Sequence, residues 1–295
     1  MINKTIQQTT KIEDIYMRDP CILLHDNKYF MYCSIPPGYG CYVSQYLLNW
    51  AGPFKVFQPP VEAGHSGIDC WWAPECHIYQ GKFYLFATYK SSKNEKRGVS
   101  IFRSDNPLGP FEEIGRPCPE EWDTIDGTLY VDNSGTPWMV FVHEFTSMPD
   151  GIGDFSLAKL SNDLSQFISE PIPLFKANEL PTNPNNHVTD GCWPYRTKTG
   201  RLLMIWSGFT LNGYVVAIAR SLTNNIAGPW EQLPQLLYEK GSGIAEEGGH
   251  GMIFTTYEGQ LMLSLHSPNG GGHERAKFIE LEDIGDTLRV RGENI

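Results

Sequence analysis

A candidate catalytic carboxylate stands near the start of the chain, in the segment Tyr16-Met17-Arg18-Asp19-Pro20. Pro20 pushes the preceding Asp19 towards an extended conformation, and Arg18 favours the ionised form of a nearby carboxylate. An Asp before a Pro is also a common turn residue, so this segment alone leaves both interpretations open. We interpret Asp19 as a general base because acidic residues recur at comparable points further along the chain.

Four later segments repeat this arrangement of a polar residue just before a short apolar run. Trp72-Ala73-Pro74-Glu75, Ile125-Asp126-Gly127 and Thr189-Asp190-Gly191 each supply a carboxyl group, and Gly249-His250-Gly251 supplies an imidazole. A buried carboxylate is costly unless it is paired or hydrogen-bonded. If several carboxylates lie close together in the fold, a catalytic role is therefore a better explanation for them than packing.

Hydrolysis of a glycosidic bond is a reaction that needs such a group of acids. One carboxyl group stays protonated to donate to the leaving oxygen, while another is ionised and acts on water or on the sugar. A third acid close to the proton donor raises the pKa of that donor by like-charge repulsion. Asp19, Asp126 and Asp190 have the number needed for these three roles.

A repeated motif predicts the elements that position these acids. A Gly or Asn turn followed by an aromatic and aliphatic run occurs at residues 27–32, 81–86, 135–141, 200–205 and 259–263. The spacing of about 50 to 65 residues is typical of propeller blades. The triplets at residues 52–54, 109–111 and 228–230 combine Gly, Pro and an aromatic residue, and each predicts a turn before an outer strand.

We therefore predict an all-β fold, a five-bladed β-propeller with four antiparallel strands per blade. The expected blades are residues 15–60, 68–116, 122–176, 186–239 and 243–292. No stretch has convincing helical periodicity, and no linker divides the chain. A single catalytic propeller domain over residues 1–295 is the expected organisation.

Composition narrows the class of partner and the expected compartment. A formal net charge of -11 argues against nucleic acid and anionic membranes as partners and fits a neutral ligand. The seven cysteines include no Cys-x-x-Cys pair, and Cys21, Cys33 and Cys76 lie in apolar runs, which predicts free buried thiols. Because no apolar signal core or membrane-spanning run is present, we expect a cytoplasmic protein, or a secreted one if a leader has been trimmed.

The motifs at Arg18-Asp19-Pro20, Trp72 to Glu75, Ile125 to Gly127 and Gly249 to Met252 together resemble glycoside hydrolase family 43. The resemblance covers almost the whole chain. It implies five-bladed propeller enzymes that act on arabinose- and xylose-containing polysaccharides, with inversion at the anomeric carbon. It also implies that Asp19 is the general base, that Asp126 tunes and orients the acid, and that a carboxyl group in blade four is the general acid.

The chain departs from the family pattern at the acid. The family has a Glu-Gly-Pro triplet where this chain has Asp190-Gly191-Cys192. Asp190 is our first choice as the acid, Glu144 in His143-Glu144-Phe145 is the substitute, and a damaged site in a non-catalytic sugar-binding propeller is a third hypothesis. No Asn-Asp-Pro-Asn motif precedes Asp19, which favours a water-mediated mechanism over a covalent one.

Further residues beside the acids are candidates for binding. Trp72 and Trp193 are predicted to stack on a sugar ring, and Glu75 and His143 are predicted substrate contacts. Arg275 is either a sugar contact or half of a surface salt bridge. His250 is either a packed axial residue or, as the resemblance implies, a neighbour of a structural Ca²⁺ on the axis; no cofactor is required.

The sequence thus predicts hydrolysis of glycosidic bonds in plant-type oligo- or polysaccharides. An α-L-arabinofuranosidase is the first expectation, and a β-xylosidase or an exo-acting galactosidase of the same fold is the alternative. The expected partner is the carbohydrate substrate. Endo or exo action and the oligomeric state are left open.

Overall fold

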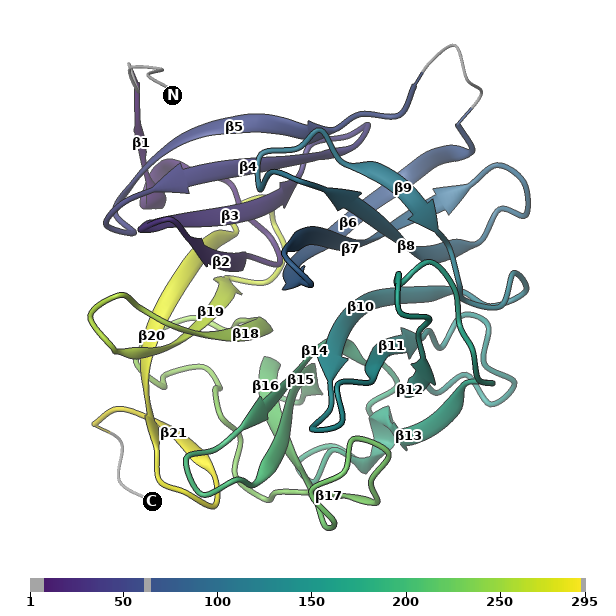
Figure 1. The fold of residues 1–295 in the computed structure, drawn as a ribbon. Coiled ribbons are helices and arrows are strands. Elements are labelled where there is room, and N and C mark those ends of the chain that lie inside the picture. Colours follow the sequence, from purple (N-terminus) through teal and green to yellow (C-terminus); the bar gives the residue numbers. More distant parts are fainter. Residues whose placement is uncertain (1–7, 61–64, 293–295) are drawn as a thin grey trace.

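A computed structural model describes residues 8–60 and 65–292, and its regular structure is almost entirely β-strand. The strands form five antiparallel sheets, each built from one continuous stretch of chain. Figure 1 shows the five sheets arranged around a central axis like the blades of a propeller. The predicted all-β propeller of four-stranded blades is therefore confirmed.

The bounds of the strands follow the predicted blades closely. Blade one contains β2 (Cys21–His25), β3 (Lys28–Ser34), β4 (Tyr39–Ser44) and β5 (Asn49–Phe57). Blade two contains β6 (Gly67–Tyr79), β7 (Lys82–Ser91), β8 (Arg97–Ser104) and β9 (Glu112–Gly115). Blade three contains β10 (Thr124–Val131), β11 (Pro137–His143), β12 (Asp154–Lys159) and β13 (Ile172–Lys176). Blade four contains β14 (Asp190–Arg196), β15 (Leu202–Thr210), β16 (Gly213–Ser221) and β17 (Trp230–Gln232), and blade five contains β18 (Gly249–Thr255), β19 (Leu261–Ser267), β20 (Arg275–Asp283) and β21 (Leu288–Val290).

Two details of the sheets differ from the prediction. A short strand, β1 (Thr10–Lys11), pairs with β5 and gives blade one a fifth strand. Gly52-Pro53-Phe54 lies within β5 instead of before it, because the pairing of β5 with β4 shifts register there and accommodates the Pro. Two 3₁₀ turns, η1 (Ile12–Asp14) and η2 (Ala177–Glu179), complete the elements of the described residues.

The aromatic runs of the sequence form the second strand of each blade, and both faces of these strands are buried. In β7, Phe83 and Leu85 pack against blade one, whereas Tyr84 and Phe86 pack against blade three. A strand that is covered on both faces needs apolar residues at every position, which explains the continuous apolar runs. Five apolar clusters of this kind lie between neighbouring blades and stabilise the ring.

The ring closes between blades five and one, which contain the two ends of the described chain (Figure 1). One apolar cluster joins Met31 of β3 to Met252 of β18. Beside it, the Met17 N–H donates to the Glu274 carbonyl at 3.0 Å, and Arg18 Nη1 donates to Glu274 Oε1 at 2.9 Å. The segment that carries Asp19 is therefore fixed by contacts with the far end of the chain.

Each blade has a residue with positive φ at an equivalent position, where its inner strand begins or bulges. These residues are Asp19, Ala73, Asp126, Gly191 and His250, with φ between 40° and 54°. In blades two to five a shift in pairing register brackets this residue. The left-handed conformation costs an L-residue about 1–2 kcal/mol, and such strain is characteristic of functional sites. Asp19, Asp126 and His250 are residues that the sequence motifs had singled out, but the expectation of an extended Asp19 is wrong, since its φ is +50°.

All seven cysteines are free, as predicted, and all but the partly exposed Cys70 are buried. Among the described residues, no helix has the length and apolar character needed to cross a membrane.

Candidate active site

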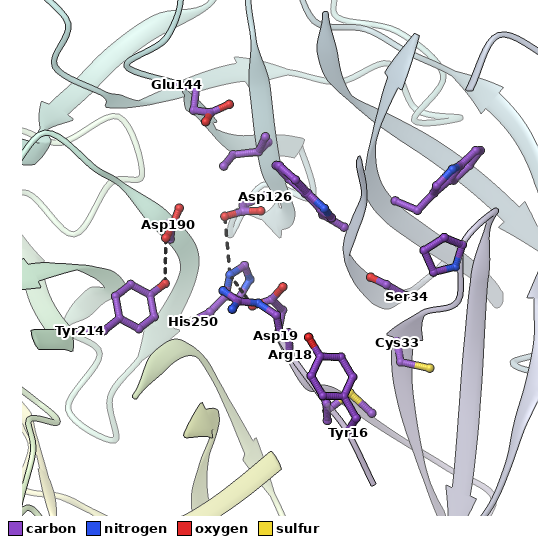
Figure 2. A pocket seen from close by; sticks show the side chains of 15 residues that line it. Tyr16, Arg18, Asp19, Cys33, Ser34, Asp126, Glu144, Asp190, Tyr214 and His250 are labelled. Carbon is purple, nitrogen blue, oxygen red and sulfur yellow. Dashed lines mark hydrogen bonds and ion pairs between the residues drawn. The ribbon is translucent and has the colours of Figure 1, made fainter. Parts of the chain in front are cut away.

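A cavity of about 470 Å³ opens at the propeller axis and receives side chains from all five blades. Figure 2 shows Asp19, Asp126, Asp190 and His250 pointing toward one another in this cavity, with Glu144 on a separate part of its wall. The three acids come from blades that are far apart in the sequence. The inner strands thus assemble the site that the motifs predicted.

Asp19 is the carboxylate of this site that is held in its ionised form. Its Oδ1 lies 3.3 Å from His250 Nδ1. Burial opposes the charge, but the positive charge of His250, followed by the approach of His266 and then by Arg18, holds the pKa of Asp19 well below its usual range. The prediction that Arg18 favours the ionised form agrees with this result, although the hydrogen-bonded partner of the guanidinium is Glu274.

Asp126 has the opposite tendency. Burial is the main cause, and the nearby carboxylates of Asp190 and Asp19 add to it, so the pKa of Asp126 is raised although His250 opposes the shift. Its Oδ2 accepts a hydrogen bond from the Gly191 N–H at 2.9 Å. Because Gly191 follows Asp190 directly, this bond links Asp126 to the backbone of the next acid.

Asp190 is also biased towards its protonated form. Burial raises the pKa of Asp190, and the effect outweighs the opposing contributions of His250 and the Tyr214 hydroxyl. That hydroxyl lies 3.0 Å from Asp190 Oδ2 (Figure 2). The residue with positive φ in blade four is Gly191, so Asp190 stands one position earlier in its strand than Asp126 does. This offset changes the direction from which the shorter Asp side chain enters the cavity.

His250 connects the acids. Its Nδ1 lies 3.3 Å from Asp19 Oδ1 and 3.7 Å from Asp126 Oδ2. Burial opposes protonation of the ring, but the carboxylates, Asp19 first, raise the pKa of His250 to about 9. The imidazolium therefore compensates part of the negative charge at the axis.

The arrangement around His250 does not form a cation site by itself. No group of three or more His, Cys, Asp or Glu residues in the described chain has an arrangement that could hold a metal ion. Calcium prefers a shell of oxygen ligands, whereas the imidazole Nδ1 faces the carboxylates of Asp19 and Asp126. The structural Ca²⁺ stays a prediction, and none of the chemistry below depends on it.

Glu144, the substitute for the acid, also lines the cavity. Burial raises the pKa of Glu144 to about 7, against the attraction of Arg97. Arg97 Nε lies 3.0 Å from Glu144 Oε2 as an ion pair, but the approach lacks hydrogen-bond geometry, so Oε2 has no hydrogen-bond partner among the described residues. In Figure 2 Glu144 lies apart from the group around His250.

The predicted substrate contacts divide into one that lines the cavity and four that do not. Trp72 lines it with 40% of the residue exposed, and the Arg97 guanidinium lies 5.7 Å from its ring centre. The other four do not line it. Glu75 is buried beside His77, and its charge acts on His250 at the axis. His143 stacks on Trp122, Trp193 stacks on His77, and Arg275 donates to the Glu13 carbonyl. Substrate binding by these four residues stays a prediction, and alternation along a strand together with the bulges keeps them from lining this cavity.

Sequence reasoning missed two residues that contact the acids. Tyr214 of β16 lines the cavity and bonds Asp190, and His266 of β19 approaches Asp19 at 3.1 Å from Nδ1 to Oδ1. Both rings are fully buried and they stack on each other at 5.6 Å. Neither stands beside an acid in the sequence, so only the alignment of the blades could have found them.

A buried cavity that combines one ionised carboxylate with carboxyl groups biased towards protonation defines a site for acid and base catalysis. The five-bladed propeller and this site are those of a glycoside hydrolase. The sequence model of the glycosyl hydrolases family 43 matches residues 12–282, and the chain belongs to this family. No match to a curated protein was found.

Solved structures with the same fold are also similar over nearly their full length. An endo-arabinase from Bacteroides thetaiotaomicron VPI-5482 is 33% identical, with a TM-score of 0.84 over 93% of this chain and 97% of that one. A thermostable family-43 glycoside hydrolase is 22% identical, with a TM-score of 0.84 over 97% and 96% of the two chains. A β-xylosidase/α-arabinofuranosidase from a compost microbial metagenome, in complex with xylotriose, is 17% identical, with a TM-score of 0.70 over 95% and 96%.

Proposed function

We propose that this glycoside hydrolase cleaves α-L-arabinofuranosidic bonds in arabinose-containing oligo- or polysaccharides, with inversion at the anomeric carbon. The observation that carries the proposal is the entry of Asp19, Asp126 and Asp190 into one axial cavity from three different blades. An ionised carboxylate and a protonated carboxyl group in one pocket are the pair that glycosidic hydrolysis needs.

The roles follow from the opposite pKa shifts. Asp19, which stays ionised, accepts a proton from the attacking water as the bond from water oxygen to the anomeric carbon forms. Asp190, which retains its proton, donates it to the glycosidic oxygen as the bond to the leaving group breaks. Asp126 holds the Gly191 N–H next to Asp190 and so orients the acid. After the reaction Asp19 releases its proton to solvent and the Asp190 carboxylate takes up a proton from solvent, which returns both groups to their starting forms.

Asp190 is favoured over Glu144 as the acid by its neighbours. Its carboxyl group raises the pKa of Asp126 and feels the charges of Asp19 and His250, so it belongs to the same group of interacting charges. Glu144 is held by Arg97 on another part of the wall. The acid must reach the glycosidic oxygen while the base-activated water attacks the anomeric carbon from the opposite face, and we take Asp190 for this role because it shares the cavity and its charges with Asp19.

The preference for arabinose rests on the 33% identity with the endo-arabinase. The name of that relative also favours a second form of the proposal, internal cleavage of a linear arabinan in place of release of terminal arabinose. Ring stacking on the exposed Trp72 suits either form, because a sugar presents an apolar face to an aromatic ring.

A panel of aryl glycosides and linear arabinan distinguishes these forms. Release of p-nitrophenol from the α-L-arabinofuranoside supports the exo form, and oligosaccharides released from linear arabinan support the endo form. If only the β-D-xyloside or the β-D-galactoside is turned over, the proposal of an arabinose-containing substrate is wrong, and the substrate contains xylose or galactose. NMR of the first product formed gives the anomeric configuration, and retention of configuration would contradict the proposed mechanism.

A further inference from the structure

The N–H groups of the positive-φ residues take part in a repeated hydrogen bond between blades. The Asp126 N–H donates to Thr88 Oγ1 of the preceding blade at 3.3 Å, and the His250 N–H donates to Ser207 Oγ of the preceding blade at 2.8 Å. Thr88 and Ser207 occupy the same position in their blades. Each pairs with the residue just before the positive-φ residue of its own blade, Thr88 with Trp72 and Ser207 with Asp190.

The same bond is made where the ring closes, but there the acceptor is a histidine. The Asp19 N–H donates to His266 Nδ1 at 3.3 Å. His266 pairs with Gly249, the residue before His250, so it holds in blade five the position of Thr88 and Ser207. By its register, His266 is therefore the residue that accepts the N–H of the positive-φ residue in the next blade. That residue is Asp19, the proposed base.

Blade three shows what happens when this position lacks an acceptor. Its residue there is Val142, which pairs with Ile125. The N–H that would meet it, from Gly191, donates to Asp126 Oδ2 instead. The buried N–H of a positive-φ residue needs a hydrogen-bond partner. The side chain at this second-strand position supplies the partner in blades two, four and five, and in blade three the carboxylate of Asp126 supplies it.

The neighbours of the His266 ring fix which nitrogen carries the proton. Arg18 Nη2 donates to Asn269 Oδ1 at 3.2 Å, so this oxygen, an acceptor, is the atom that faces His266 Nε2 at 3.1 Å. Nε2 must then carry a proton. Nδ1 has two neighbours within reach, the Asp19 N–H, which needs a lone pair, and Asp19 Oδ1 at 3.1 Å, which needs a proton.

The lone pair on Nδ1 is favoured by the surrounding charges. The Asp19 carboxylate already has the His250 imidazolium and the Arg18 guanidinium as neighbours. A second imidazolium at His266, which is 0% exposed, would have to share the single Asp19 carboxylate with His250 and Arg18, and a buried charge that is incompletely paired is destabilising. The approach of Oδ1 is then a consequence of the bond to the backbone of the same residue.

We propose that His266, neutral and protonated on Nε2, is a positioning residue that holds the backbone of Asp19 in its left-handed conformation and so aims the carboxylate into the cavity. Asn269 and the stacked ring of Tyr214 fix the orientation of the imidazole. The predicted effect on catalysis rests on the proposed function, because that function makes Asp19 the base. The predicted position of the proton on His266 is independent of the proposed function.

The first test observes the proton directly. Nitrogen chemical shifts of ¹⁵N-histidine-labelled protein at pH 7 report the tautomer of each ring, and the His266 signals are identified by their loss in His266→Ala. The expected result is a neutral ring with the proton on Nε2. A doubly protonated ring, or a proton on Nδ1, would overturn the proposal, and this holds whether or not any glycoside is turned over.

The second test separates positioning from stability. His266→Ala is expected to lower kcat about 10- to 100-fold with KM little changed, because a base displaced by about 1 Å loses activity on this scale. His266→Thr, which supplies the hydroxyl used in blade two, should recover part of kcat. The matched control is Ser264→Ala on the same strand, which removes a 2.9 Å bond to the Pro20 carbonyl, next to Asp19.

The control should lower thermal stability and leave kcat within about threefold of the wild type, on the scale of ordinary mutational effects. Equal losses of kcat in Ser264→Ala and His266→Ala would show that His266 acts only through stability and would overturn the positioning role. If the wild type is inactive on every glycoside, the proposed function fails, and the nitrogen spectra alone decide the proton position of His266.

Discussion

The hydroxyl of Tyr214 lies 3.0 Å from Asp190 Oδ2 and donates to it, so a residue of β16 controls the proposed acid on β14. A hydrogen bond to the ionised form of a carboxylate lowers its pKa. Tyr214 therefore opposes the shift that burial imposes on Asp190, and it limits how far the acid holds its proton at alkaline pH.

This relationship predicts the pH dependence of a Tyr214→Phe variant. Because Asp190 must be protonated, kcat/KM falls as pH rises through its pKa, which burial has raised. Loss of the hydroxyl raises that pKa again, so the alkaline limb of the profile should move to higher pH by about one unit. Tyr238→Phe is the control, since this equally buried tyrosine donates to the Glu246 carbonyl. An unmoved limb in Tyr214→Phe would exclude Asp190 as the acid.

Asp19→Asn should keep the fold and lose nearly all turnover. The amide cannot accept a proton from water, and a general base contributes about 10²- to 10⁴-fold. The variant should still fold at neutral pH, as shown by circular dichroism, but with lower stability, because the amide no longer balances the positive charges of His250 and Arg18. Activity within tenfold of the wild type would remove Asp19 from the mechanism.

The two candidate acids are separated by the dependence of rate on the leaving group. Asp190→Ala should lose about 10²- to 10⁴-fold on a substrate with a poor leaving group and much less on an activated aryl glycoside, which departs without a proton. Glu144→Ala should show similar losses on both substrates, since its carboxyl group lies beside Arg97 on another part of the wall. The reverse pattern would assign the acid to Glu144.

Gly191→Ala tests the close packing of the axis. An added Cβ would lie 2.7 Å from His250 Cδ2, at a residue whose φ is +40°. Gly200→Ala is the matched control, because Gly200 also has positive φ, +85°, but has no atom within 4 Å of the added Cβ. The control should lose about 1–2 kcal/mol of unfolding free energy in urea denaturation.

The Gly191→Ala variant should lose more unfolding free energy than the control, and it should lose activity as well because His250 must move. Equal unfolding free energies in the two variants would show that the ring of His250 has room to shift, which would contradict the tight packing described for the axis.

The repeated turns and apolar runs of the sequence were sufficient to predict five blades, because a strand covered on both faces needs apolar residues at every position and this pattern is local. The motifs also placed Asp19, Asp126 and His250 correctly, since a residue just before an inner strand must face the axis of a propeller. The motif also placed Asp190 at the cavity but did not predict its offset relative to Gly191, which depends on where the bulge falls.

The tertiary structure alone decided which neighbours these acids have. A shift of one residue turns a side chain to the other face of a strand, so Trp193 stands in a predicted segment yet stacks on His77 and does not line the cavity. Tyr214 and His266 contact the acids from β16 and β19, and no motif in these two strands indicates that contact. Hydrogen bonds and charge interactions act across a few ångströms of space, and only the closed ring brings β19 of the last blade against Asp19 of the first.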